Sequence, residues 1–394
     1  MNILFTGYYF DGYHGSMMHI CEIGKYLKSF GHNIYIASCI IDDKIKKYTE
    51  ELGLNLYYAD EIPLDIHYDL IWAYHFPIIN YLYQKQIKYD KIICGCLSGF
   101  LHPLETPPLF CKNNNIPIFV NSKETKSNLI KEYPVFENKV DILINSVPDE
   151  FLLHKKTTYD NSLKKIAIVS NHVPKELLET IRTFKRMKIK VDIFGSEFKH
   201  IPVTPELLSD YDLIITIGKT VQYALFMGIP VYNYDYMGGS GYIRLNNIDN
   251  EEFYNFSGRS HNRKLSSDDI ICEILAYYKD TLLEMDKIQE IARQRYSLSQ
   301  NINNILAIVE NMPNNKLEIT EEIKLNLTQN CFLFEQTLNT NKYLKYNKHK
   351  YKYIQNVIKL SYFKYRLLAN VPFVRKKIIP IKQEYKKLLE NIKE

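Results

Sequence analysis

Residues 218–220, Gly-Lys-Thr, place a flexible turn, an ammonium group and a hydroxyl where a strand gives way to a helix. The apolar, β-rich residues 212–217 before them are typical of a strand buried on both faces of a parallel sheet. The following helix is predicted to end at Gly228, because glycine is favoured at a left-handed helix cap. A helix that starts at the carboxyl end of a strand presents free N–H groups and a positive dipole end, so Gly218, Lys219 and Thr220 predict an anion-binding site.

The Gly-Lys-Thr turn also occurs at the end of the P-loop of nucleoside triphosphatases. That motif requires a glycine where this chain has Leu213, which excludes the class. An ordinary strand–turn–helix connection without a ligand remains an alternative. After the next predicted strand, Gly238, Gly239 and Ser240 are expected to form a loop that lets the backbone approach a ligand closely.

Histidines at the ends of predicted strands are the candidates for acid–base chemistry, because imidazole titrates near neutral pH. His102 follows the predicted strand 91–96, in a loop stiffened by prolines, and Glu105 is within its reach. His75 ends the predicted strand 69–75 in the same way. Each of these side chains has the alternative of a structural or surface role.

No metal site is expected. Asp210 and Asp212 match a short D-x-D pattern, but they fit the end of a helix and the start of a buried strand better. The seven cysteines are odd in number and scattered, which is typical of reduced thiols in a cytoplasmic protein.

Alternating strands and helices predict an α/β fold with two doubly wound parallel halves facing a cleft. The first half opens with strand 2–6, a glycine-rich loop 7–15 and a helix that Ser16 caps and Gly31 closes. A polar stretch, 154–163, separates the predicted domains 1–153 and 164–311. The second half contains strands 166–170 and 190–194, and it ends with helices 268–279 and 285–310. Residues 312–394 are expected to form a helical, basic C-terminal extension.

The net charge of +5 hides an asymmetry between this extension and the rest of the chain. Residues 342–394 hold 15 Lys or Arg and 3 Asp or Glu, interleaved with aromatic and aliphatic residues, whereas residues 1–341 are net acidic. No apolar run is long enough for a membrane span. Such a segment suits the surface of an anionic membrane, so a peripheral location at its cytoplasmic face is expected. The alternative is a pair of helices packed on the acidic body. Nucleic acid is not expected as a partner, because no nucleic-acid-binding fold accompanies the basic residues.

Several stretches, in this order and spacing, resemble the GT-B glycosyltransferases, and most of all the retaining family 4. They are the opening loop and helix with Gly31-His32, the strand DLIWAYH, the segment ILINSVPDEF between the halves, and GKTVQYALFMGIPV with GGSG. The resemblance covers about residues 1–310. It implies two Rossmann-like domains, the second binding a nucleotide-sugar donor and the first a glycan or lipid-linked acceptor. It also implies that neither a metal nor a cofactor is required.

The resemblance further implies roles for particular residues of the donor site. Gly15 would lie near the donor phosphates, and Lys175 matches a lysine that binds the diphosphate. Thr220 and residues 238–240 would line the diphosphate and the donor sugar. Gly195 would face the nucleotide, and His172 lies on the donor side. Lys175, Lys219 and the helix end would neutralise the leaving diphosphate.

The chain departs from the family at the two glutamates usually spaced E-x7-E, since Ile215 and Tyr223 occupy those positions. The predicted function is transfer of a sugar to a bacterial surface glycan or glycoconjugate. Two alternatives stay open: a GT-B nucleotide-sugar epimerase, and a non-catalytic partner that binds sugar nucleotides or glycans.

Overall fold

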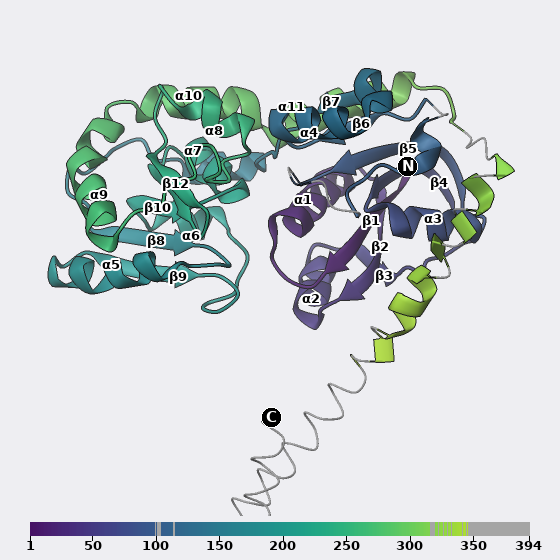
Figure 1. Ribbon diagram of the computed structural model, residues 1–394, viewed down its shortest axis with the longest axis horizontal. Helices are drawn as coiled ribbons and strands as arrows, with labels where there is room; N and C mark the ends of the chain where they lie inside the picture. The colour runs from purple at the N-terminus through teal and green to yellow at the C-terminus, as the bar shows by residue number, and fades with distance from the viewer. Residues whose placement is uncertain are drawn as a thin grey trace, which may run out of the picture. The chain divides into compact units, whose positions relative to one another are not determined.

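The computed structural model describes residues 1–345, apart from positions 99, 101–103, 113–114, 316–319, 322, 326, 329, 332, 341 and 344 (Figure 1). The chain divides into two compact units, residues 1–332 and 333–394. Most of the basic extension lies outside the described residues, so its expected helical structure and membrane contact remain predictions. Within the described part of the chain, no helix combines the length and the apolar character needed to cross a membrane.

The first half is built on a seven-stranded sheet in the order β3-β2-β1-β4-β5-β6-β7, with every recorded strand pair parallel. Its strands are β1 (Asn2–Phe10), β2 (Asn33–Ile41), β3 (Asn55–Tyr58), β4 (His67–Tyr74), β5 (Lys88–Cys96), β6 (Ile118–Val120) and β7 (Val140–Ile142). The central strand β1 sets Ile3 opposite Ile34 of β2 and Leu70 of β4, and all three side chains are buried.

Helices and short 3-10 segments connect these strands. They are α1 (Gly15–Ser29), α2 (Asp43–Glu51), α3 (Phe76–Gln84), η1 (Leu109–Lys112), α4 (Lys123–Glu132), η2 (Pro134–Lys139) and η3 (Asp149–His154). The apolar residues of α1 that the sequence spaces at three and four, Ile20, Ile23 and Leu27, all pack in the core of this half. Gly31, just beyond the helix, has a φ of 80°, as the predicted glycine stop requires.

The second half has a five-stranded sheet in the order β12-β11-β10-β8-β9, in which only β12 pairs antiparallel. Its strands are β8 (Lys165–Val169), β9 (Lys190–Phe194), β10 (Leu213–Thr216), β11 (Val231–Asp235) and β12 (Gly238–Tyr242). Its helices are α5 (Lys175–Arg186), α6 (Pro205–Ser209), α7 (Lys219–Met227), α8 (Ile248–Phe253), α9 (Ser267–Leu282) and α10 (Met285–Tyr296), followed by α11 (Leu298–Asn311). The predicted α/β architecture of two Rossmann-like, doubly wound halves is confirmed.

The chain returns to the first half at Ser297. The expected single helix over 285–310 is wrong, because Ser297 has an extended ψ of 122° and its hydroxyl caps α11 by accepting from Gln300 N–H. Leu298, Ile302, Ile305 and Val309 of α11 then pack in the core of the first half. A helix that follows the second sheet in sequence therefore supports the first sheet.

Two other local predictions are also corrected. Ser16 is not the cap of α1: the helix begins one residue earlier, with His14 at the cap position and no side-chain cap bond. The expected loop 7–15 is shorter, because β1 continues to Phe10 through pairing with β2 as far as Ile41. Pairing between strands distant in sequence decides both boundaries.

Candidate active site

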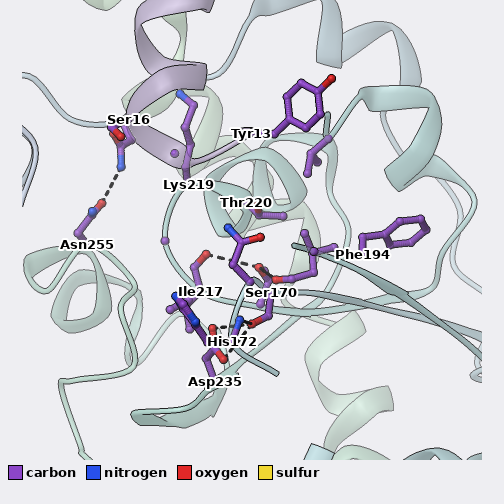
Figure 2. A pocket seen from close by; sticks show the side chains of 18 of the residues that line it. Tyr13, Ser16, Ser170, His172, Phe194, Ile217, Lys219, Thr220, Asp235 and Asn255 are labelled. Carbon is purple, nitrogen blue, oxygen red and sulfur yellow. Dashed lines mark hydrogen bonds between the residues drawn. The ribbon is translucent and has the colours of Figure 1, made fainter. Parts of the chain in front are cut away.

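A cavity of about 300 Å³ lies between the two halves and is lined by both (Figure 2). The second half contributes the carboxyl ends of four strands, with Ser170 after β8, Gly195 after β9, Thr216 at the end of β10 and Asp235 at the end of β11. The first half contributes Tyr13, Gly15 and Ser16 around the start of α1, with Leu97, Asn121 and Asn145. Ligands bind at this edge of open α/β sheets because the connections there leave a crevice.

Two helices begin at this cavity, one from each half. Gly15 is the first residue of α1, and Gly218 precedes α7 with a φ of 63° and a ψ of −139°, a conformation that favours glycine. The atom nearest to a Cβ built on Gly15 is Cβ of Lys219, at 3.8 Å, so the two helix N-termini adjoin. The first amides of a helix lack an acceptor in a preceding turn, although in α7 Val221 N–H donates to the Gly218 carbonyl oxygen at 3.0 Å. Two positive dipole ends therefore meet at one cavity, where they favour an anion.

Lys219 lines the cavity, but its ammonium group is engaged elsewhere. Nζ lies 2.8 Å from Oε2 of Glu22 in α1 and donates to the carbonyl oxygen of Ser146 at 2.7 Å. The Tyr223 hydroxyl donates to the same carboxylate, and the Lys219 ammonium sits 5.2 Å from the centre of the Tyr223 ring. Burial raises the pKa of Glu22, while Lys219 acts against that rise. In this arrangement Lys219 offers the cavity its main-chain amide, and its charge holds the two halves together.

Tyr223, one of the two positions where the family usually has glutamates, is part of the same arrangement. Tyr223 occupies the place of the second glutamate, stacks on Phe151 with ring centres 4.7 Å apart, and reaches Glu22 from the opposite half. Ile215 is fully buried in β10. A carboxylate at the Tyr223 position would face Glu22, so the tyrosine found there fits the Glu22–Lys219 pair.

Of the other predicted donor-site residues, Gly15, Gly195, Gly218 and Thr220 line the cavity. A Cβ on Gly195 would lie 1.7 Å from the carbonyl oxygen of Ser170, so only glycine fits between the ends of β8 and β9. The structure does not bring Lys175 to the cavity: its side chain is 87% exposed and pairs with Glu179 on the surface of α5.

The predicted loop over Gly238, Gly239 and Ser240 is wrong. These residues form the start of β12, which pairs antiparallel with β11. A Cβ on Gly238 or Gly239 would lie 2.2 Å from the Arg263 carbonyl oxygen or 1.9 Å from that of Asn233. The two glycines permit close packing of main chains, and none of the three residues lines the cavity.

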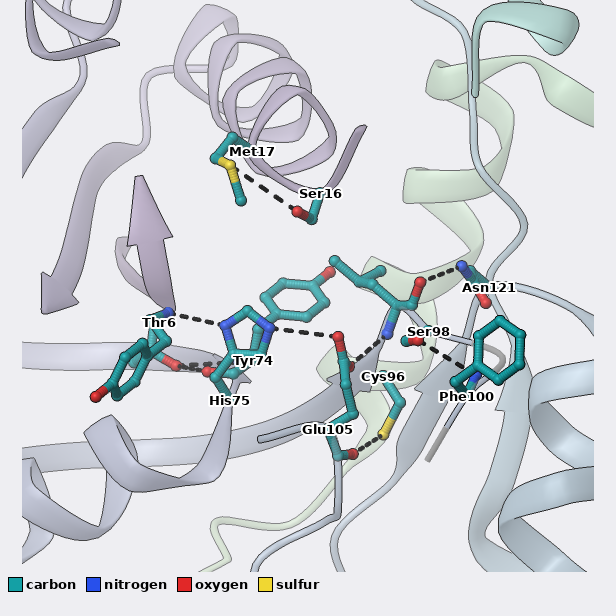
Figure 3. A network of polar contacts seen from close by, with 12 residues as sticks. Thr6, Ser16, Met17, Tyr74, His75, Cys96, Ser98, Phe100, Glu105 and Asn121 are labelled. Carbon is teal, nitrogen blue, oxygen red and sulfur yellow. Dashed lines mark hydrogen bonds and ion pairs between the residues drawn. The ribbon is translucent and has the colours of Figure 1, made fainter. Parts of the chain in front are cut away.

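His75 and Glu105 lie together in a buried polar network of the first half (Figure 3). Tyr8 N–H donates to Nδ1 of His75 at 2.8 Å, so in the neutral ring the proton is on Nε2, which faces Glu105 Oε1 at 3.3 Å. The other Glu105 oxygen accepts from Leu97 N–H at 2.8 Å. Neither residue lines the cavity, so in this structure both have a structural role within the first half. His102, the third predicted acid–base residue, lies outside the described residues.

Sequence reasoning missed a polar cluster on the floor of the cavity. Asp235 is 2% exposed, and its carboxylate accepts the Ser170 hydroxyl at 3.0 and 2.9 Å and Tyr236 N–H at 2.7 Å. The main-chain N–H of His172 donates to the Ser170 hydroxyl at 2.8 Å. Figure 2 shows these side chains together. The sequence does contain one indication of this cluster: Ser170 and Asp235 both lie where a parallel strand ends.

Burial raises the pKa of Asp235 to about 6, against the opposing effects of Tyr236 N–H, Ser170 and His172. The native carboxyl therefore holds a proton between about pH 4 and 6 that the unfolded chain has released, so the free energy of unfolding should fall as pH rises through this range. We expect Asp235→Asn to be about 2 kcal/mol more stable than the wild type at pH 8 and nearly equal to it at pH 4. Urea unfolding at the two pH values measures this, and an equal effect at both would contradict it.

The D-x-D pattern has a structural role at Asp212, whose carboxylate accepts the main-chain N–H groups of Lys164 and Lys165 at 3.0 and 2.9 Å. Within the described residues, no group of three or more His, Cys, Asp or Glu side chains is arranged to hold a metal ion. The expected independence of metal stays a prediction.

Comparison with known proteins finds similarity in structure but not in sequence. The sequence matches no family model, and no curated protein matches it. The fold is similar to a glycosyltransferase from Rickettsia africae, with a TM-score of 0.50 and 16% identity over 78% of this chain and 97% of that one. A protein described as a UDP-N-acetylglucosamine 2-epimerase from Listeria monocytogenes aligns at a TM-score of 0.47 and 13% identity, over 81% of this chain and 99% of that one. WaaG, a glycosyltransferase involved in lipopolysaccharide biosynthesis, aligns at a TM-score of 0.49 and 10% identity, over 77% of this chain and 99% of that one.

The chain has the GT-B fold, in which two Rossmann-like halves face each other across a cleft, as the sequence resemblance implied. Identities this low show the fold alone. The closer likeness to family 4 therefore remains a prediction.

Proposed function

We propose that the chain is a glycosyltransferase that binds a nucleotide-diphosphate sugar in the cavity between its halves and transfers the sugar to a glycan or lipid-linked acceptor. The observation that carries this proposal is the meeting of two helix N-termini, those of α1 and α7, at one polar cavity. A diphosphate is the part of such a donor that needs this environment, because it is charged in the ground state and gains charge as it leaves.

The remaining lining suits the rest of a sugar nucleotide. Phe194, Ile201 and Val203 give an apolar side near β9, where a planar base can be desolvated. Asn121, Asn145 and Asn255 present amide groups, which can donate to and accept from sugar hydroxyls. Transfer would exchange the bond between the anomeric carbon and the diphosphate for a bond to the acceptor oxygen, and the departing diphosphate would take up the acceptor's proton.

The proposal includes a place of action at the cytoplasmic face of a membrane, where lipid-linked acceptors for bacterial surface glycans are found. It rests on the excess of Lys and Arg among residues 342–394, which favours an anionic surface. No metal or cofactor is part of the proposed reaction.

The experiment is an assay of nucleotide release by the full chain, with each common nucleotide sugar, in the presence and absence of lipid-linked glycan acceptors. Release of a nucleoside diphosphate that depends on the acceptor, with the sugar recovered on it, is the expected result. Sugar isomerisation without an acceptor would identify an epimerase instead. Binding without turnover at any acceptor would identify a non-catalytic protein.

A further inference from the structure

A positive side chain would add to the two helix N-termini in stabilising the charge of a leaving diphosphate. Along its described lining, the side chains that can carry positive charge are Lys219, His172 and His200. The Lys219 ammonium is neutralised by Glu22 and held at the Ser146 carbonyl. Lysine therefore does not fill this role in the arrangement that the structure shows, and the two histidines remain.

His200 is held in the neutral form. Tyr13 N–H donates to its Nε2 at 3.4 Å, so that nitrogen presents a lone pair. Burial lowers the pKa of His200 below its ordinary value of 6.5, and the charges of Lys44 and His14 lower it further. At neutral pH this ring contributes a hydrogen-bonding group and no charge.

His172 is in a different environment. It lies in the turn between β8 and α5, its side chain is exposed, and neither ring nitrogen has a hydrogen-bond partner among the described residues. The ring meets Tyr236 edge-on, with centres 5.3 Å apart. Its main-chain N–H is fixed to the Ser170 hydroxyl, which donates in turn to Asp235 (Figure 2).

We propose that His172 is the residue whose ring binds the diphosphate of the donor, in place of the lysines expected there. This inference rests on the proposed function. When the bond between the anomeric carbon and the diphosphate breaks, the electron pair stays on the phosphate oxygen. The ring would donate a hydrogen bond to that oxygen while the acceptor oxygen bonds to the carbon and releases its proton to the diphosphate.

Few charged side chains surround His172 at the anion site. The titratable side chains that line its cavity are Asp235 from β11, Lys219 from α7, His200 from the loop after β9 and Tyr13 from the first half, and Tyr236 contacts its ring. Asp235 is the one acidic group among the cavity-lining residues described.

Calorimetric titration of the full chain with inorganic pyrophosphate at pH 6, 7 and 8 tests this proposal, because the probe reports on the anion site without a base or a sugar. Comparing variants at the same pH cancels the protonation of the probe. His172→Gln should bind about tenfold more weakly than the wild type, since the hydrogen bond from the ring to the anion is lost. His172→Lys, which places a cation at the same position, should bind at least as tightly as the wild type at each pH.

The matched control is His154→Gln, which removes a histidine paired with Glu206 outside this cavity and should follow the wild type at each pH. Thermal unfolding of every variant checks that the fold is intact. If the wild type binds pyrophosphate and nucleoside diphosphates while His172→Gln matches it at every pH, the role of His172 is refuted and the proposed function stands. If the wild type binds neither probe at any pH, both proposals fail.

Discussion

Replacing Lys219 with Met is expected to lower the free energy of unfolding by about 3 to 5 kcal/mol at pH 8. The substitution leaves the buried carboxylate of Glu22 without its cation, and the Tyr223 hydroxyl alone does not compensate a buried charge. The pKa of Glu22, already raised by burial, should rise further once Lys219 no longer lowers it. The native carboxyl would then be protonated well above the unfolded value near 4.5, so the variant's stability should fall as pH rises from about 5 to 8.

Urea unfolding of Lys219→Met at pH 5 and pH 8 measures this dependence. The control is the double variant Glu22→Gln/Lys219→Met, which removes both charges and should recover more than half of the loss at pH 8. A single variant as stable as the wild type at pH 8, or a loss that does not change with pH, would show that the ion pair does not join the two halves as described.

Gly195→Ala is the second substitution with a large expected effect. Its Cβ would lie 1.7 Å from the Ser170 carbonyl oxygen and 2.7 Å from the carbonyl carbon, so main chain must move. Ser170 N–H also donates to Phe194 O at 2.9 Å, and the ends of β8 and β9 would be pushed apart at the cavity. We expect a loss of about 3 kcal/mol in stability and a loss of ligand binding of at least tenfold, since backbone shifts of this kind are costly.

Gly31→Ala is the matched control, because Gly31 has a φ of 80° but nothing lies within 4 Å of its Cβ. It should cost about 1 kcal/mol through backbone strain and leave ligand binding unchanged. Chemical denaturation and pyrophosphate titration of both variants give the comparison. Equal losses in the two would mean that the close approach of Gly195 to Ser170 has no special importance.

The sequence predicts local features of the site well, because they depend on neighbouring residues. The strand before Gly218, the short helix after it and the cap at Gly228, with a φ of 78°, are all present as expected. These are decided by β-rich composition, by glycine's access to positive φ, and by the proline at position 230 that cannot continue a helix.

The contacts that a side chain makes depend on residues far away in the sequence, and the spacing of residue types along the chain does not reveal them. Lys219 reads as a free cation in sequence, and Glu22, almost two hundred residues away, neutralises it. Gly238 and Gly239 read as a ligand loop, whereas pairing with β11 makes them a strand. The link between Ser170 and Asp235 likewise exists only because β8 and β11 flank β10 in the folded sheet.

The most direct test of the central claim, that the cavity between the starts of α1 and α7 binds a nucleoside diphosphate, is thermal unfolding of the full chain with a panel of nucleotide sugars. The panel holds UDP-, GDP-, dTDP- and ADP-sugars, the free nucleoside diphosphates, and a CMP-sugar with a single phosphate. We expect one diphosphate class to raise Tm by a few degrees at saturating concentration, since a ligand at 100 times its Kd adds about 2.7 kcal/mol. The same ligand should shift Gly195→Ala far less than Gly31→Ala. If no nucleotide shifts the Tm of the wild type, in a chain that unfolds cooperatively, this cavity is not a nucleoside-diphosphate site.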